Sequence, residues 1–323
     1  MLRFAFMFLL AGVVLLSWAP GSPAGGRQKV FLDTDIGTDI DDAFALALIL
    51  SSPELDLVGV TVATGQTRER ARIVCRMLYE AGREDIPVAV GRETSVPVTS
   101  GKPPAYEPQF HWASGFDAVK PVDTPAADFI IQNLREHPGE IVLITIGPVT
   151  NIGDVLRKDP GALKDAKAVY AMFGSFYRGY GGSTTPSREW NVVSDVEAAK
   201  LYVASGVKIT YAGLDVTAHV TLDANRRLRL LMRQSPLTNA LCGLYSLWGR
   251  ETPILFDPVA VGMLLWPELF TFRDVHIHVT DDGFTVVDEA GPPNARIGTQ
   301  IDEKRFLKRV MDRYLQQNLG RTR

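Results

Sequence analysis

Five aspartates lie within ten positions near the start of the chain, in the segment VFLDTDIGTDIDDAFALALIL at 30–50. They are Asp33, Asp35, Asp39, Asp41 and Asp42. The apolar runs on either side predict burial, and buried carboxylates that repel one another are costly unless a cation or a proton neutralises them. A helix N-terminus stabilises an anion by only about 0.3–1 kcal/mol. Because Ca²⁺ takes several oxygen ligands, a divalent cation explains the cluster best.

Two simpler interpretations of the cluster use fewer of its acids. In the first, Asp33 is a turn residue, and the acids at 41 and 42 cap a helix while the others are solvated. In the second, the segment is an EF-hand loop. That motif fits poorly, because counting from Asp33 places Gly37 at the fifth position and Phe44 at the twelfth, where a glutamate is required.

The surrounding elements must bring these acids to one edge of a sheet. Short runs rich in Val and Ile alternate with amphipathic segments, which predicts βαβ units and a parallel sheet covered on both faces. Strands are expected at 30–33, 55–64, 86–91, 141–147, 167–174 and 208–216, and helices at 41–52, 68–82, 124–139, 150–159 and 195–206. In such sheets a ligand binds beyond the carboxyl ends of the strands.

The C-terminal part predicts a hairpin at 273–289, turned at Asp282-Gly283, and then a helix at 302–317. We therefore expect an α/β fold: a single domain with a mostly parallel, Rossmann-like central sheet flanked by helices, plus a small C-terminal β-hairpin. Two long polar loops, at 93–120 and 176–190, depart from the alternating pattern and are expected to carry function.

Composition and charge exclude one class of partner. The 323 residues include 34 Lys plus Arg against 37 Asp plus Glu, a formal net charge of −3. Proteins that bind nucleic acid normally carry a cationic face, so no nucleic-acid partner is expected.

The first residues are typical of a secretory signal peptide. Arg3 precedes an uncharged apolar run from Phe4 to about Trp18, and small residues follow, with cleavage expected after Ala24. We expect residues 1–24 to be this signal and residues 25–323 to be the mature catalytic domain. The chain would be exported to the periplasm or secreted, without stable membrane association after cleavage. The alternative is an uncleaved membrane anchor, for which the run is short.

Motifs spread through the chain resemble those of the inosine-uridine-preferring nucleoside hydrolase family. Its first strand ends in Asp-x-Asp-x-Gly-x-Asp-Asp-Ala, which DTDIGTDIDDA at 33–43 matches with two extra positions. IGPVTNI at 146–152, REWN at 188–191, GLDVT at 213–217 and FDPVAV at 256–261 follow in family order, and the resemblance covers about 29–315. It implies calcium-dependent hydrolysis of the N-glycosidic bond of ribonucleosides to ribose and free base. The partner expected is a small-molecule nucleoside, in a homodimer or homotetramer.

The resemblance also implies a role for each matched position. Asp35 falls on the general base, which activates water at the metal and contacts the ion itself. The metal ligands are then Asp35, Asp42, Ile146 through its backbone carbonyl, and Asp257. The ribose-binding residues are Asp41, Met172, Glu189, Trp190 and Asn191.

Three positions, Asp39, Gly65 and Phe256, depart from the family pattern. Asp39 has no counterpart, and it either supports a ligand by hydrogen bonding or is a solvated loop residue. Gly65 stands where several members have an asparagine that reaches the sugar. Phe256 stands where members that favour inosine have a histidine that protonates the leaving base. His111, in FHWASG, matches a His-x-x-x-Gly pattern and is the candidate catalytic acid, or alternatively a surface histidine.

Two other functions compete with hydrolysis. Asp33-Thr34-Asp35 after a buried strand also suggests a haloacid-dehalogenase-like phosphatase, although Gly37 stands where that family has Thr or Val. The signal peptide, together with the missing His and Asn, fits an exported nucleoside- or ribose-binding protein without catalysis. The sequence leaves the preferred base open, because contacts to the base would come from the two long loops.

Overall fold

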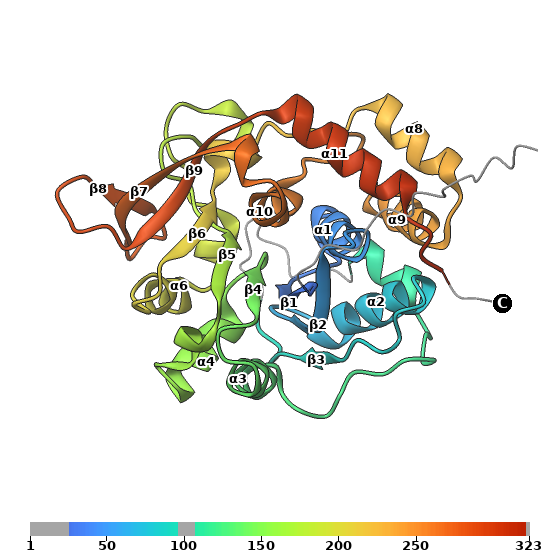
Figure 1. Cartoon of the computed structure of the whole chain (residues 1–323), viewed down its shortest axis with the longest axis horizontal. Coiled ribbons are helices and arrows are strands. Elements are labelled where there is room, and N and C mark those ends of the chain that lie inside the picture. Colours follow the sequence, from blue (N-terminus) through green and yellow to red (C-terminus); the bar gives the residue numbers. More distant parts are fainter. Residues whose placement is uncertain (1–25, 96–106, 321–323) are drawn as a thin grey trace, which may run out of the picture.

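The computed structural model describes residues 26–95 and 107–320 (Figure 1). The predicted signal peptide lies outside the described residues, as does the middle of the 93–120 loop. One sheet has the strand order β3-β2-β1-β4-β5-β6-β9-β7-β8. The strands are β1 (Gln28–Thr34), β2 (Leu55–Val62), β3 (Val88–Val90), β4 (Val142–Thr145), β5 (Ala168–Met172), β6 (Ile209–Ala212), β7 (Phe270–Val279), β8 (Thr285–Asp288) and β9 (Ala295–Ile301).

The strand order contains a topological switch point between β1 and β4. The chain builds outward from β1 through β2 to β3, and then returns to start the other half of the sheet at β4. All pairings from β3 to β9 are parallel, and Asp33 at the end of β1 lies opposite Thr61 of β2 and Thr145 of β4. The crevice beyond such a switch point is where α/β sheets bind their ligands.

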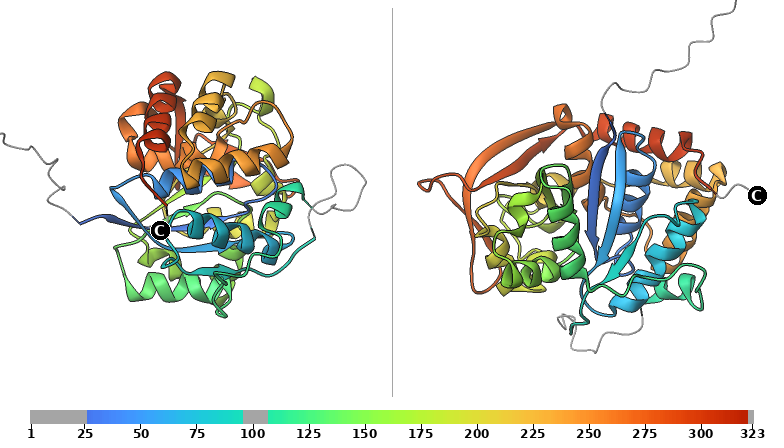
Figure 2. Two further views of the ribbon diagram at one scale, coloured as in Figure 1. Left: turned by 90° about the vertical axis from the view of Figure 1, so that its right-hand side faces the viewer. Right: turned by 60° about the horizontal axis from the view of Figure 1, so that its bottom comes forward.

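Helices cover both faces of the sheet, and β1 shows why. Val30 and Leu32 belong to one apolar core, whereas Phe31 between them belongs to the other, because successive side chains of a strand point to opposite faces. Figure 2 shows the two helical layers. One layer comprises α1 (Asp41–Leu50), α2 (Thr67–Glu80), α7 (Leu214–Thr217), α8 (Ala224–Arg233), α9 (Pro236–Trp248), α10 (Phe256–Leu265) and α11 (Glu303–Gln316). The other comprises α3 (Ala126–Glu136), α4 (Thr150–Lys158) and α6 (Val196–Val203).

The C-terminal hairpin is confirmed, but it is not a separate appendage. β7 and β8 pair antiparallel, and Gly283 in their turn has a φ of 84°. β7 also pairs with β9, a strand that the sequence analysis missed, and β9 continues the parallel sheet from β6. The strand expected at 208–216 is shorter than predicted, because the chain turns into α7 after Gly213. Within the described ranges, no helix is both long enough and apolar enough to span a bilayer.

Candidate active site

A cavity of about 300 Å³ opens beyond the carboxyl ends of β1, β4 and β5, at the switch point. The structure brings nearly all of the expected site residues to its wall. The expected metal ligands Asp35, Asp42, Ile146 and Asp257 line it, and so do the expected ribose-binding residues Asp41, Met172, Glu189, Trp190 and Asn191. These residues come from five separate segments of the chain, so only the fold could unite them.

Three buried carboxylates form the centre of the cavity. Oxygen atoms of Asp41, Asp42 and Asp257 all lie within 4.8 Å of one another, although the residues are at most 5 % exposed. The first two begin α1 and the third lies in the first turn of α10, and these two helices pack side by side. Burial raises the pKa of each carboxyl well above its ordinary value, and the neighbouring carboxylates raise it further. The arrangement therefore calls for a cation.

Asp35 is tied to this centre through the backbone. Its N–H donates to Oδ1 of Asp42 at 3.1 Å, and the same oxygen accepts from the Thr34 hydroxyl at 2.5 Å. Burial raises the pKa of Asp35, whereas the guanidinium of Arg70 acts in the opposite direction. The end of β1 and the start of α1 are thus joined by one carboxylate, which fixes the direction in which the chain leaves the sheet.

Asp33 lies beneath the cavity rather than in its wall. Its Oδ1 accepts hydrogen bonds from the Thr61 hydroxyl at 2.6 Å and from Nδ2 of Asn151 at 2.7 Å. Its Oδ2 is buried without a hydrogen-bond partner, and burial raises the pKa of this carboxyl to about 7. The first aspartate of the cluster therefore connects β1, β2 and α4.

The REWN motif joins the ends of β4 and β5. Glu189 caps α5 (Trp190–Val193) by accepting from the N–H of Asn191 at 2.9 Å, and it also accepts from the N–H of Gly174 at 3.0 Å. Nδ2 of Asn191 donates to the carbonyl of Ile146 at 2.9 Å and to that of Met172 at 3.0 Å. Burial raises the pKa of Glu189 to about 7.

The mouth of the cavity contains residues to which the sequence analysis gave no site role. Thr38, Tyr180 and Arg250 line it, beside Asp39 and Phe256. The rings of Tyr180 and Phe256 pack edge to face with centroids 6.1 Å apart. The position of Tyr180 in the long polar loop 176–190 was a signal for function. Arg250 follows α9 and carried no signal, because only the tertiary structure brings it here.

His111, the candidate acid, does not line the cavity. It is an exposed residue of the short helix η1 (Pro108–Ala113). Its neighbour Gln109 does reach the aspartate loop, where Nε2 donates to the carbonyls of Thr38 and Asp39 at 3.1 and 2.9 Å. The helix therefore supports the loop, while the catalytic role of His111 stays a prediction.

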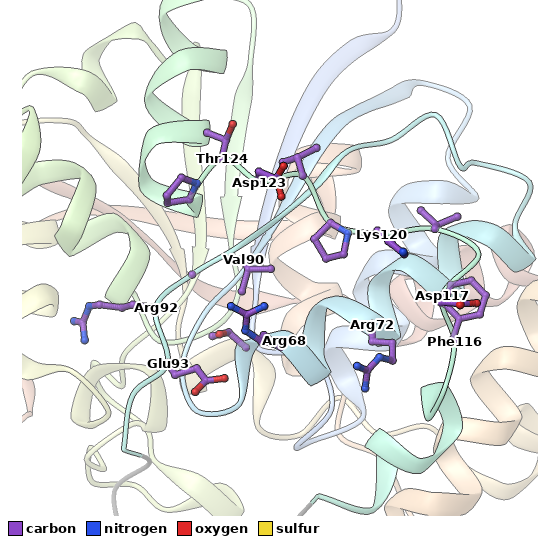
Figure 3. A pocket seen from close by; sticks show the side chains of 16 residues that line it. Arg68, Arg72, Val90, Arg92, Glu93, Phe116, Asp117, Lys120, Asp123 and Thr124 are labelled. Carbon is purple, nitrogen blue, oxygen red and sulfur yellow. The ribbon is translucent and has the colours of Figure 1, made fainter.

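A larger hollow of about 840 Å³ shares no lining residue with this centre, and Figure 3 shows it from close by. Arg68 and Arg72 of α2 face it, together with Glu93, Asp117 and Lys120. These side chains are at least partly exposed and of both charges, and the acidic cluster belongs to the other cavity. The larger volume therefore does not mark the reactive site.

Comparisons with known proteins agree with this fold and site. The family model described as inosine-uridine preferring nucleoside hydrolase matches residues 30–308. An α/β sheet with buried acids beyond its switch point places a ligand-binding site there, and this match specifies the family. The chain belongs to the inosine-uridine preferring nucleoside hydrolase family, and it is an N-glycosyl hydrolase of ribonucleosides.

Relatives match along nearly their whole length. A non-specific ribonucleoside hydrolase, RihC, of Escherichia fergusonii is 33 % identical, and the match covers 88 % of this chain and 98 % of the relative. A probable uridine nucleosidase 2 of Arabidopsis thaliana is 28 % identical, covering 90 % and 99 %. The solved plant nucleoside hydrolase PpNRh1 superposes with a TM-score of 0.78 at 27 % identity, covering 90 % of this chain and 99 % of that one. These matches set aside both the phosphatase and the purely binding interpretations.

Proposed function

We propose that the chain is a calcium-dependent ribonucleoside hydrolase in which Asp35 is the general base. The observation that carries the proposal is the crowding of buried oxygens from Asp41, Asp42 and Asp257 within 4.8 Å. Such acids remain ionised only beside a cation. Carboxylates and a backbone carbonyl are hard oxygen donors, which suit Ca²⁺ better than a transition metal. The donor set therefore fits the proposed ion.

The residues that would hold the ion are Asp35, Asp42, Asp257 and the carbonyl of Ile146. Ca²⁺ bound there would keep the acids ionised, engage ribose hydroxyls and lower the pKa of a water molecule. One oxygen of Asp42 is already occupied by Thr34 and by the Asp35 N–H, which leaves its Oδ2 for a cation. As the C–N bond breaks through an oxocarbenium-like state, its electron pair leaves with the base, which then takes a proton from solvent or from an acid of the protein. Asp35 would take the proton of the water that adds to the anomeric carbon.

The ribose would be held by side chains whose other contacts are already fixed. Nδ2 of Asn191 is committed to backbone carbonyls, so its Oδ1 is the atom that accepts from a ribose hydroxyl. Asp41, beside the metal ligands, accepts from a second hydroxyl. Glu189 and Met172 complete this wall. Fixed acceptors of this kind cost no reorganisation in the transition state.

The nucleobase would lie at the aromatic mouth, against Tyr180, Trp190 and Phe256. Aromatic faces bind a planar base through stacking, which tolerates different bases. The curated relatives are named for uridine and for ribonucleosides in general. We therefore propose ribonucleosides as the substrate class, with uridine as the first compound to test.

One assay tests this function. Purified protein spanning 25–323 is incubated with purine, pyrimidine and nicotinamide ribosides, with Ca²⁺ or with a chelator, and released ribose is measured. We expect turnover of at least one riboside that stops with the chelator and returns with Ca²⁺. Turnover that the chelator leaves unchanged would contradict the calcium mechanism, and no turnover of any riboside would contradict the proposed substrate class.

We also propose that residues 1–24 direct export and are then removed. The composition of this segment supports the proposal, with Arg3 before an uncharged apolar run and small residues before position 25. The mature enzyme would then act in the periplasm or outside the cell. The family resemblance separately suggests that it assembles as a homodimer or homotetramer.

A further inference from the structure

A buried arginine lies directly behind the aspartate loop. Arg70 belongs to the first turns of α2 and is 3 % exposed, although it carries a full charge. Charged side chains are almost never buried so deeply unless partners satisfy them. Within the described residues, Arg70 does not line the cavity, so it is available to act on the site only through other residues.

The partners of Arg70 are concentrated on the loop that contains the proposed base. Its Nη1 donates to the carbonyl of Asp35 and, at 2.9 Å, to that of Ile36. Its Nη2 donates to the Thr38 hydroxyl at 2.8 Å and lies 4.0 Å from Oδ2 of Asp35. Its Nε donates to the carbonyl of Thr64 at 2.7 Å. Every nitrogen of the guanidinium therefore has an acceptor.

Asp35 is confined on its other side by Gly147. A Cβ at that position would come within 2.8 Å of both the backbone nitrogen and Oδ1 of Asp35. One carboxylate oxygen thus faces the backbone of the chain after β4, and the other faces the guanidinium. These two contacts restrict both the loop and the rotation of the side chain.

The loop needs such support because its path is unusual. Between Asp35 and Asp41 it has two more residues than the family motif, and Gly37 within it has a φ of 111°. The partner of Nε, Thr64, has a φ of 65°, which is uncommon for a residue with a side chain. An unfavourable backbone conformation persists where contacts with the surrounding structure hold it in place. Arg70 donates hydrogen bonds to both of these segments.

We propose that Arg70 is a positioning residue of the active site, whose guanidinium fixes the lengthened loop and the orientation of Asp35. The role rests on the proposed function, because it assigns Asp35 as the base. Lysine could supply the charge but not the planar fork of donors that bonds to Asp35, Ile36 and Thr38 together. The geometry of the fork, and not charge alone, therefore sets the base in place.

The test compares Arg70→Lys and the milder Thr38→Val with the wild type, and uses Arg76→Met as a matched control. Arg76 is on the same helix, but it stacks on Trp112 with 4.4 Å between guanidinium and ring centroid, away from the loop. We expect kcat of Arg70→Lys to fall about 100-fold while KM changes less than about three-fold, because a small misplacement of a catalytic group costs rate rather than binding. Thr38→Val is expected to fall about ten-fold, and Arg76→Met to keep the wild-type kcat.

A second measurement does not depend on activity. Hydrogen–deuterium exchange of peptides spanning 33–42 should be faster in Arg70→Lys than in wild type, and unchanged in Arg76→Met. If wild-type protein hydrolyses no riboside, but loop exchange is still faster in Arg70→Lys than in wild type, the proposed function is contradicted and the anchoring of the loop is not. Unchanged loop exchange, or a kcat of Arg70→Lys equal to that of wild type, would overturn the positioning role.

Discussion

At the scale of single residues, the hydrogen bonds that each aspartate already makes separate their roles. Asp33 is bonded to Thr61 and Asn151 below the cavity, whereas Asp35 and Asp42 line the cavity. The sequence predicted that the five acids gather, but their spacing did not reveal which of them faces inward. Residues within a motif could be assigned to the site because each motif is a continuous run of the sequence. Tyr180 and Arg250 could not, since long-range packing alone brings them to the mouth.

The proposed base gives the first prediction at this scale. Asp35→Asn keeps the size of the side chain and removes its ability to accept a proton. We expect kcat to fall by about 10²–10⁴-fold, the usual contribution of general base catalysis, with little change in melting temperature. The assay is ribose release under saturating substrate, and Asp117→Asn at an exposed position is the control. Activity of Asp35→Asn within a few-fold of wild type would show that another group is the base.

The buried acid below the cavity gives a prediction about pH. Burial raises the pKa of Asp33 to about 7 in the folded chain, from 3.8. The fold therefore favours the protonated form, so this contribution to stability is complete below pH 4 and is lost as pH rises toward 7. In metal-free protein, the melting temperature of Asp33→Asn should fall less between pH 5 and pH 8 than that of wild type. Parallel pH profiles for the two proteins would contradict this account.

At the scale of elements, the loop between β1 and α1 depends on Gly37. Its φ of 111° is unfavourable for other residues, and a Cβ there would lie 2.6 Å from the Phe110 ring. Gly139 has a φ of 73° but open space around it. Gly37→Ala should therefore lower kcat more than about ten-fold. Gly139→Ala should lower the free energy of unfolding by about 1 kcal/mol and leave kcat unchanged. Equal activities of the two variants would show that the shape of the loop does not matter.

The alternating elements were predictable because both signals are local. Apolar runs of Val, Ile and Leu mark the strands β1 to β6, and helical periodicity marks the helices between them. β9 was missed because its place in the sheet comes from pairing with β6 and β7, which are distant in the sequence. The segment GLDVT looked like the end of a strand. Its residues from Leu214 onward instead form α7, because the chain turns at Gly213. Leu214 and Val216 are buried as residues of this helix.

At the scale of the whole molecule, the doubly wound sheet is what makes the metal centre possible. It places the ends of β1 and β4 side by side, and the packing of α1 against α10 adds Asp257 to the acids of the first loop. The sequence alone predicted the sheet and its reactive edge. It could not show that the acids come within ligand distance, because that depends on how two distant helices pack.

Export gives a prediction about the intact chain. If residues 1–24 are a cleaved signal, protein expressed with its full N-terminus in a bacterial host should appear in the periplasm or medium. Its mass should be that of a chain that begins at position 25. Deleting residues 1–24 should retain the protein in the cytoplasm with unchanged kcat. Full-length protein held in the membrane fraction would instead support an uncleaved anchor.

The central claim is that a divalent ion neutralises the buried acids and completes the site. Calorimetric titration of Ca²⁺ into chelator-treated protein tests this claim most directly. We predict saturable binding of a single ion per chain in the wild type, and no measurable binding when Asp42→Asn and Asp257→Asn are combined in a variant that still folds. Folded wild-type protein that takes up no Ca²⁺, or a double variant that binds it equally well, would contradict the account.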